Sequence, residues 1–109
     1  MRQGEIWVNN TLAGILTEDD NGYHFKYLKA YLQNESSLAV SLSLPLQEET
    51  FSAEYLFPFF DGLIPEGWIL DIVHKNWKID PRDRMGLLLT TCRDCIGNIS
   101  IIEKVWTTV

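Results

Sequence analysis

The turn sequence from Asp19 to Gly22, Asp-Asp-Asn-Gly, limits the folds open to this chain more than any other feature. Asp, Asn and Gly are the residues that most readily adopt the backbone angles of tight hairpin turns. After the turn, Tyr23, Phe25 and Tyr27 alternate with polar residues, the pattern of a half-buried strand with an aromatic inner face. Before it, Leu12 to Thr17 has the composition of another strand. The sequence therefore predicts an antiparallel hairpin.

A larger antiparallel sheet is expected around this hairpin. Glu5 to Val8 has the pattern of a first strand, and Asn9-Asn10 suits a two-residue turn because Asn tolerates positive φ. Gly14, inside the second strand, marks the position of a bulge. Asn98 to Glu103 alternates again and is expected to return to the sheet as a last strand.

The middle of the chain is less regular. Residues 29–38 are polar and are expected to form a loose connection. In Ala39 to Leu46, apolar residues alternate with serine and proline, which predicts a short strand or extended segment that Pro45 restricts to a sheet edge or a strand end. Residues 47–50 follow as an exposed connection, and Ser52 is a candidate helix cap.

Three helices are expected in the second half. The first spans about Leu56 to Gly62, and the second spans about Pro65 to Trp77, with Pro65 suited to the first helical position. The third has Asp80 as its N-cap. Its apolar face, at i, i+3, i+4 and i+7, consists of Met85, Leu88, Leu89 and Cys92. The predicted fold class is α+β: a small antiparallel β-sheet, built from a hairpin or meander and a C-terminal strand, covered by about three helices.

Composition indicates one globular domain over residues 1–109. The chain is 46% hydrophobic and 12% aromatic, which suffices for an apolar core. Its net charge of −6 argues against nucleic-acid or anionic-membrane binding, because both need clustered Lys and Arg. We find no apolar run of about 20 residues that would span a membrane and no signal peptide, so a cytoplasmic location is expected.

No catalytic or metal-binding motif stands out. Cys92 and Cys95 form one C-x-x-C pair, which is at most half of a zinc site, and His24 and His74 do not complete it. Two reduced structural thiols are the favoured interpretation, and a small thiol or metal protein is the last-ranked hypothesis. The sequence also contains none of the glycine-rich phosphate-binding motifs. We therefore expect no enzyme, no cofactor and no metal.

Asp61 and Glu66 are close in sequence, and paired carboxylates can carry out acid–base chemistry. Both have ordinary structural explanations, because Asp61 lies near the end of one predicted helix and Glu66 lies in the first turn of the next. Trp68 is less easily explained. At 100° per residue, it lies about 110° from the centre of the apolar face of its predicted helix. It is either the rim of the core or an exposed anchor for a partner.

Several stretches, in this order, resemble the N-terminal subdomain of HipA-type Ser/Thr kinase toxins. They are Val8 to Leu16, Ser41 to Leu46, Pro58 to Gly67 and Arg93 to Gly97. The resemblance covers about residues 5–103 and is specific because the motifs occur together. In HipA-like kinases this subdomain precedes a kinase core, and the sequence here stops where that core would begin. The resemblance therefore implies a domain without the kinase core.

A free-standing subdomain of this kind is similar to HipS, the antitoxin of three-component HipBST systems. The resemblance implies two partners, a HipT-like Ser/Thr kinase and a HipB-like DNA-binding protein in the same complex. Since HipB binds the DNA, no direct nucleic-acid binding and no membrane association are expected of this chain. The implied function is that of an antitoxin that binds and inhibits the kinase beside its nucleotide loop. The alternative is a non-inhibitory structural subunit that completes and stabilises the kinase N-lobe.

The sequence departs from the family at two positions. Cys92 stands where the family has Gly, and Trp68 stands where the fused kinases commonly have a polar residue. A detached subdomain that inhibits its kinase needs an additional contact, and Trp68 at a helix tip could supply it. The predicted partner interface consists of Asp61, Ile64, Pro65, Glu66, Gly67, Trp68 and Ile69.

Overall fold

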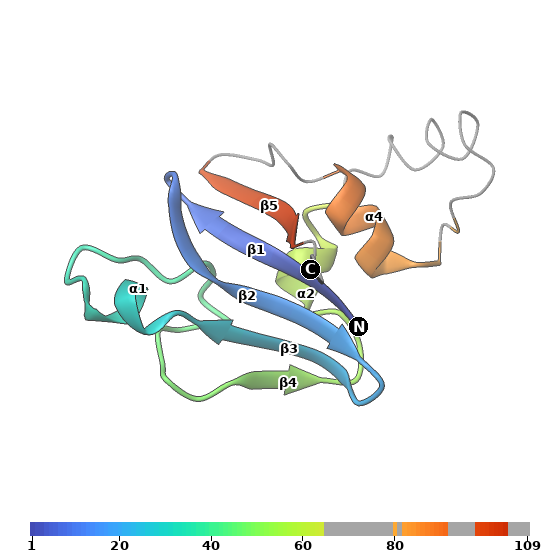
Figure 1. Ribbon diagram of the computed structural model, residues 1–109, viewed down its shortest axis with the longest axis horizontal. Helices are drawn as coiled ribbons and strands as arrows, with labels where there is room; N and C mark the ends of the chain where they lie inside the picture. The colour runs from blue at the N-terminus through green and yellow to red at the C-terminus, as the bar shows by residue number, and fades with distance from the viewer. Residues whose placement is uncertain (65–79, 81, 92–97, 105–109) are drawn as a thin grey trace, which may run out of the picture.

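Residues 1–64, 80, 82–91 and 98–104 are described by a computed structural model. Their strands form one antiparallel sheet of five strands in the order β4-β3-β2-β1-β5 (Figure 1). The strands are β1 (Arg2–Val8), β2 (Thr11–Asp19), β3 (Gly22–Tyr27), β4 (Phe51–Ala53) and β5 (Ile99–Lys104). The predicted α+β class is confirmed, and the last strand returns to the sheet beside β1.

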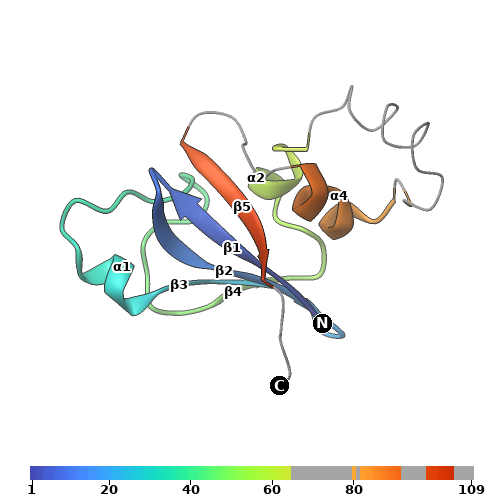
Figure 2. The ribbon, with the colours of Figure 1, turned by 45° about the horizontal axis from the view of Figure 1, so that its top comes forward.

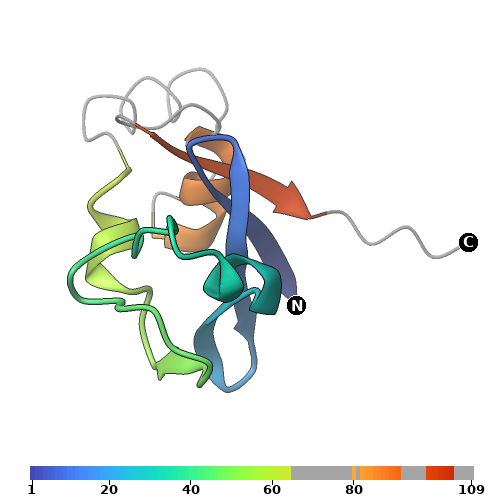
Figure 3. The ribbon, with the colours of Figure 1, turned by 90° about the vertical axis from the view of Figure 1, so that its left-hand side faces the viewer.

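The helices of the described residues are α1 (Lys29–Gln33), α2 (Pro58–Asp61) and α4 (Arg84–Thr91). Figure 2 and Figure 3 show α2 and α4 next to each other on one face of the sheet. The long connection between α1 and β4 runs on this same side (Figure 3). None of the described helices is long and apolar enough to cross a membrane.

The hydrophobic core lies between the sheet and the two helices on that face. Phe25 on β3 is fully buried, and its ring makes an edge contact with Phe60 of α2 at 5.5 Å between centroids. The predicted apolar face of the last helix is confirmed within the described residues, because Met85, Leu88 and Leu89 are all buried. The other residues with less than 2% exposure are Tyr27, Ile6, Ala13, Leu16, Leu87 and Ile101.

Both hairpin turns form as the sequence predicts. Asn9 and Asn10 have positive φ angles of 49° and 65°. Apart from Gly, Asn is the residue that tolerates this conformation best. Gly22 has φ +117°, and a Cβ on it would lie only 2.4 Å from the carbonyl oxygen of Ala53. Ile6 pairs with Gly14 but Trp7 pairs with Leu12, so the register of β1 and β2 shifts at Ala13, directly beside Gly14, where the bulge is predicted.

The middle of the chain differs from the prediction. Residues 29–33 form α1 instead of a loose connection, and Ser52 lies within β4 instead of capping a helix. Ala39 to Leu46 contains no strand. It folds back on itself through an isolated bridge between Ser41 and Leu44, so its alternating pattern belongs to a turn.

The start of the last helix also differs. Asp83, not Asp80, caps α4, because the Asp83 carboxylate accepts a hydrogen bond from the backbone N–H of Gly86 at 3.2 Å. Asp80 instead accepts from the backbone N–H of Arg82 at 2.9 Å and shapes the preceding turn. The first predicted helix, Leu56 to Gly62, is shortened to α2. The second, Pro65 to Trp77, lies outside the described residues.

The buried hydroxyl of Tyr27 holds the turn that replaces the predicted strand. It accepts a hydrogen bond from the backbone N–H of Val40 at 3.0 Å and donates one to the backbone oxygen of Leu44. Both partners are themselves buried residues, with 7% and 2% exposure. One side chain on β3 therefore fixes both ends of the segment 40–44.

We expect Tyr27→Phe to lower the free energy of unfolding by about 1–3 kcal/mol, because two buried backbone groups lose their partner. Urea denaturation measures this loss. Tyr55→Phe is the matched control, since Tyr55 is 80% exposed, and a change within about 0.5 kcal/mol is expected there. Equal stabilities of the two variants would contradict the assigned role of Tyr27.

Candidate functional site

The predicted partner interface begins at the end of α2, where the structure describes Asp61 and Ile64. Asp61 accepts a hydrogen bond from Nε of Arg84 at 2.5 Å, an ion pair that joins the end of α2 to the start of α4. Ile64 is only 4% exposed and belongs to the core. Its backbone N–H donates to the carbonyl oxygen of Asp61 at 3.2 Å, so the chain is held by the domain up to residue 64.

The remaining predicted interface residues lie outside the described residues. These are Pro65, Glu66, Gly67, Trp68 and Ile69, and their place in an interface stays a prediction. Asp61 and Ile64 are held within the domain itself: one is half of an ion pair, and the other is buried. Their arrangement fixes the point from which the following segment departs.

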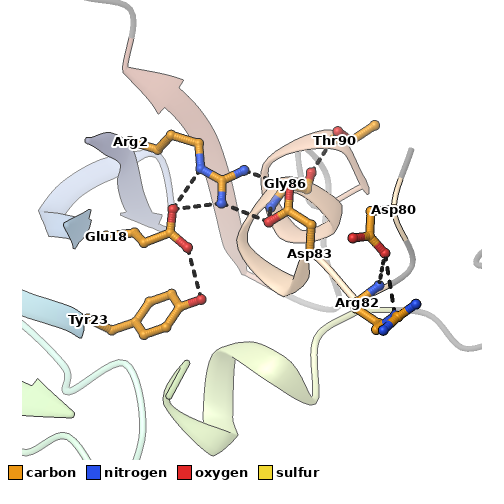
Figure 4. A network of polar contacts seen from close by, with 8 residues as sticks. All are labelled: Arg2, Glu18, Tyr23, Asp80, Arg82, Asp83, Gly86 and Thr90. Carbon is orange, nitrogen blue, oxygen red and sulfur yellow. Dashed lines mark hydrogen bonds and ion pairs between the residues drawn. The ribbon is translucent and has the colours of Figure 1, made fainter. Parts of the chain in front are cut away.

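A network of polar contacts around Arg2 supports α4, the helix beside the end of α2 (Figure 4). The guanidinium of Arg2 donates to both carboxylate oxygens of Asp83, at 2.8 and 2.7 Å, and its Nε donates to Glu18 at 2.7 Å. The hydroxyl of Tyr23 donates to the other oxygen of Glu18 at 3.0 Å. The network joins β1, β2 and β3 to the N-terminus of α4. Since Arg2 and Asp83 are 81 positions apart, no local sequence pattern indicated it.

The ionisation of these groups follows from their contacts. The hydrogen bonds from Arg2 lower the pKa of Asp83 below its usual value of 3.8. The same interaction, with Asp83 as its largest cause, raises the pKa of Arg2. Burial, followed by the hydrogen bond to Glu18, raises the pKa of Tyr23 to about 12. Asp83 and Arg2 are therefore both charged at neutral pH, and Tyr23 is protonated.

Asp19, His24 and Ser52 form a second polar chain on the sheet. The ring of His24 lies 2.8 Å from Oγ of Ser52 through Nδ1 and 3.1 Å from Oδ1 of Asp19 through Nε2. A hydrolase triad uses the same three residue types, but its histidine faces the serine with Nε2 and the carboxylate with Nδ1, so the ring of His24 is turned the opposite way. Catalysis also needs a substrate site beside the serine, and none of the described cavities is lined by both Ser52 and His24. The contacts are better explained as cross-strand hydrogen bonds between β2, β3 and β4.

Metal binding finds no support in the described part of the chain, where no group of three or more His, Cys, Asp or Glu side chains is arranged around a common point. Cys92, Cys95 and His74 lie outside the described residues. The thiol or metal hypothesis therefore stays a prediction.

The five-stranded antiparallel sheet, with α2 and α4 on one face, defines a small α+β domain. The sequence model of the HipA N-terminal domain family matches residues 4–102, and the chain belongs to this family. A solved structure of the N-terminal domain of HipA toxin superposes with a TM-score of 0.76 and 29% identity, over 98% of this chain and 96% of that one.

Two relatives place the domain in chains of different length. An uncharacterized protein of Haemophilus influenzae is 32% identical over 104 residues, which are 95% of this chain and 94% of that protein. The putative kinase Y4mE of Sinorhizobium fredii is 31% identical over 100 residues, which are 91% of this chain but 24% of the kinase. The similarities support a component of a HipA-related toxin–antitoxin system.

Replacing Gly86 with Ala tests the geometry of the network. In most helices this change stabilises by about 1 kcal/mol. Here a Cβ on Gly86 would lie 2.4 Å from Oδ2 of Asp83, whose carboxylate is held by Arg2. We expect Gly86→Ala to destabilise the domain by roughly 1 kcal/mol instead, measured by urea denaturation. The loss should shrink in an Arg2→Gln background, where Asp83 can move. A stabilised Gly86→Ala variant would contradict this geometry.

The acid stability of the domain depends on Asp83. Its pKa is lowered in the folded state, so its contribution is complete above the unfolded pKa of 3.8 and is lost as pH falls through the folded value. We expect the free energy of unfolding to fall more steeply below about pH 4 in the native protein than in Arg2→Gln. Urea denaturation at several pH values between 6 and about 2 measures both slopes. Parallel slopes would show that Arg2 does not control this titration.

Proposed function

We propose that this chain is a HipS-like antitoxin that binds and inhibits a HipT-like Ser/Thr kinase. The observation that carries the proposal is the occurrence of the same domain in two settings. It accounts for 94% of the Haemophilus relative, but for only 24% of the putative Sinorhizobium kinase. A domain that is fused to a kinase in one protein and makes up nearly all of another is suited to dock on a separate kinase.

In this proposal the segment after α2 carries the inhibitory contact. Asp61 and Ile64 hold its starting point, one through the ion pair with Arg84 and one through burial in the core. Pro65 to Ile69, with Trp68 foremost, then docks beside the nucleotide loop of the kinase and blocks its cleft. Buried Trp residues are frequent hot spots of protein interfaces because they remove a large apolar area from water.

We further propose that the chain acts in the cytoplasm and is not an enzyme. A HipB-like protein supplies DNA binding in the same complex, in line with the net charge of −6 of this chain.

A second function is favoured by the Sinorhizobium relative. There, a domain of this family is part of a longer putative kinase chain. A separate copy could complete and stabilise the N-lobe of its kinase without inhibiting it. The two functions differ in what they expect of kinase activity in the complex: loss for an antitoxin, and retention or a rise for a structural subunit.

Phosphorylation by the cognate HipT-like kinase, measured with and without this chain, decides between them. We expect the native chain to abolish activity and Trp68→Ala to weaken inhibition by about 30- to 1,000-fold, the effect of losing one Trp hot spot. Tyr55→Ala serves as control, because it removes another aromatic side chain that is 80% exposed. Full kinase activity with the native chain demonstrably bound would overturn the antitoxin function and favour the structural subunit. Inhibition that survives Trp68→Ala unchanged would overturn the tip mechanism alone.

A further inference from the structure

Leu42 is the most exposed large apolar side chain of the described residues. Its relative exposure is 103%, compared with 80% for Tyr55 and 60% for Leu38. It stands between two buried neighbours along the chain, Val40 and Leu44, at 7% and 2%. The chain therefore buries both ends of this segment and presents its middle residue to solvent.

The turn that carries Leu42 is fixed by hydrogen bonds. The backbone N–H of Leu44 donates to the carbonyl oxygen of Ser41 at 3.1 Å, and the N–H of Ser43 donates to Oγ of Ser41 at 3.2 Å. The two serine hydroxyls lie 3.0 Å apart and share a further hydrogen bond. The hydroxyl of Tyr27 holds both ends of the segment. We call residues 40–44 the leucine turn.

Nothing in the local geometry of the leucine turn calls for an apolar side chain at its tip. Tight turns favour polar residues, Gly and Pro, and a fully exposed leucine keeps its whole apolar surface in water. A side chain held on a rigid turn loses little conformational freedom when it enters a pocket, so its burial contributes more fully to affinity. Leu38 and Leu46, 60% and 39% exposed, add apolar surface on either side of the turn.

Two observations indicate what covers this surface. The connection that contains the leucine turn lies on the same side of the sheet as α2 and α4, and so on the side of Asp61 and Ile64 (Figure 3). A single partner on this side can contact both regions. In the Sinorhizobium relative, the other three quarters of the chain belong to a putative kinase. A kinase is therefore the partner that we expect to contact a separate copy of this domain.

We propose that the leucine turn is a second docking element, which inserts Leu42 into an apolar pocket on the kinase. This proposal rests on the proposed function, because the same kinase receives both contacts. The leucine turn supplies affinity and is separate from inhibition by the segment after residue 64. Removing Leu42 therefore weakens binding while the bound complex remains inhibited.

Calorimetric titration of the cognate HipT-like kinase with the native chain and with Leu42→Ala tests the proposal. We expect Leu42→Ala to bind about 10- to 100-fold more weakly, the effect of leaving one leucine unburied. Its urea denaturation should match that of the native chain, because Leu42 makes no contribution to the core. Ile102→Thr is the matched control: it removes apolar surface from a 43% exposed residue of β5 and keeps a β-branched side chain. Kinase activity at saturating Leu42→Ala should be as low as with the native chain.

The outcomes separate this proposal from the proposed function. If Leu42→Ala binds as tightly as the native chain, or if Ile102→Thr weakens binding equally, the docking role of the leucine turn is overturned and the antitoxin function stands. If Leu42→Ala binds more weakly and also leaves the saturated kinase active, the separation of docking from inhibition is overturned. If the native chain does not bind the kinase, both proposals fail.

Discussion

The contact between Phe25 and Phe60 ties the sheet to the helix that precedes the proposed inhibitory segment. Both rings are fully buried, and Phe25 also contacts Tyr27 at 4.8 Å and Phe51 at 6.3 Å between centroids. A helix as short as α2 is not stable alone, since helices below about 12 residues are marginal in water. The aromatic packing therefore stabilises α2 against the sheet.

Charged contacts then orient the two helices on this aromatic base. Asp61 pairs with Arg84 between α2 and α4, and Arg2 on β1 joins α4 to β2 through Asp83 and Glu18. Each of these pairs is partly exposed, so each contributes modestly to stability. Their geometry matters more than their energy, because bidentate pairing restricts the rotation of α4 about its own axis.

The sequence predicted those features of the fold that local chemistry determines. The strands followed from alternation, and the turns followed from Asn9-Asn10 and Gly22, residue types that adopt the positive φ these turns require. Prediction was wrong for Ala39 to Leu46, because an alternating pattern also arises when a turn buries Val40 and Leu44 and exposes Leu42. The short α1 lacks a capping side chain that would mark its start. The Arg2 network joins residues distant in sequence, so no local sequence pattern indicated it. The predicted interface beyond Ile64 lies outside the described residues.

The two hydrogen bonds of the Tyr27 hydroxyl hold the leucine turn in place within the connection between α1 and β4. They divide this connection into two stretches, one before the turn and one after it. The chain is anchored at Val40 and again at Leu44, so the stretches on either side are joined to the domain separately. Residues inserted between Leu46 and Phe51, or removed there, would be absorbed before the chain reaches β4. The position of Leu42 would not change. The length of this surface loop can therefore change during evolution without moving the side chain of Leu42.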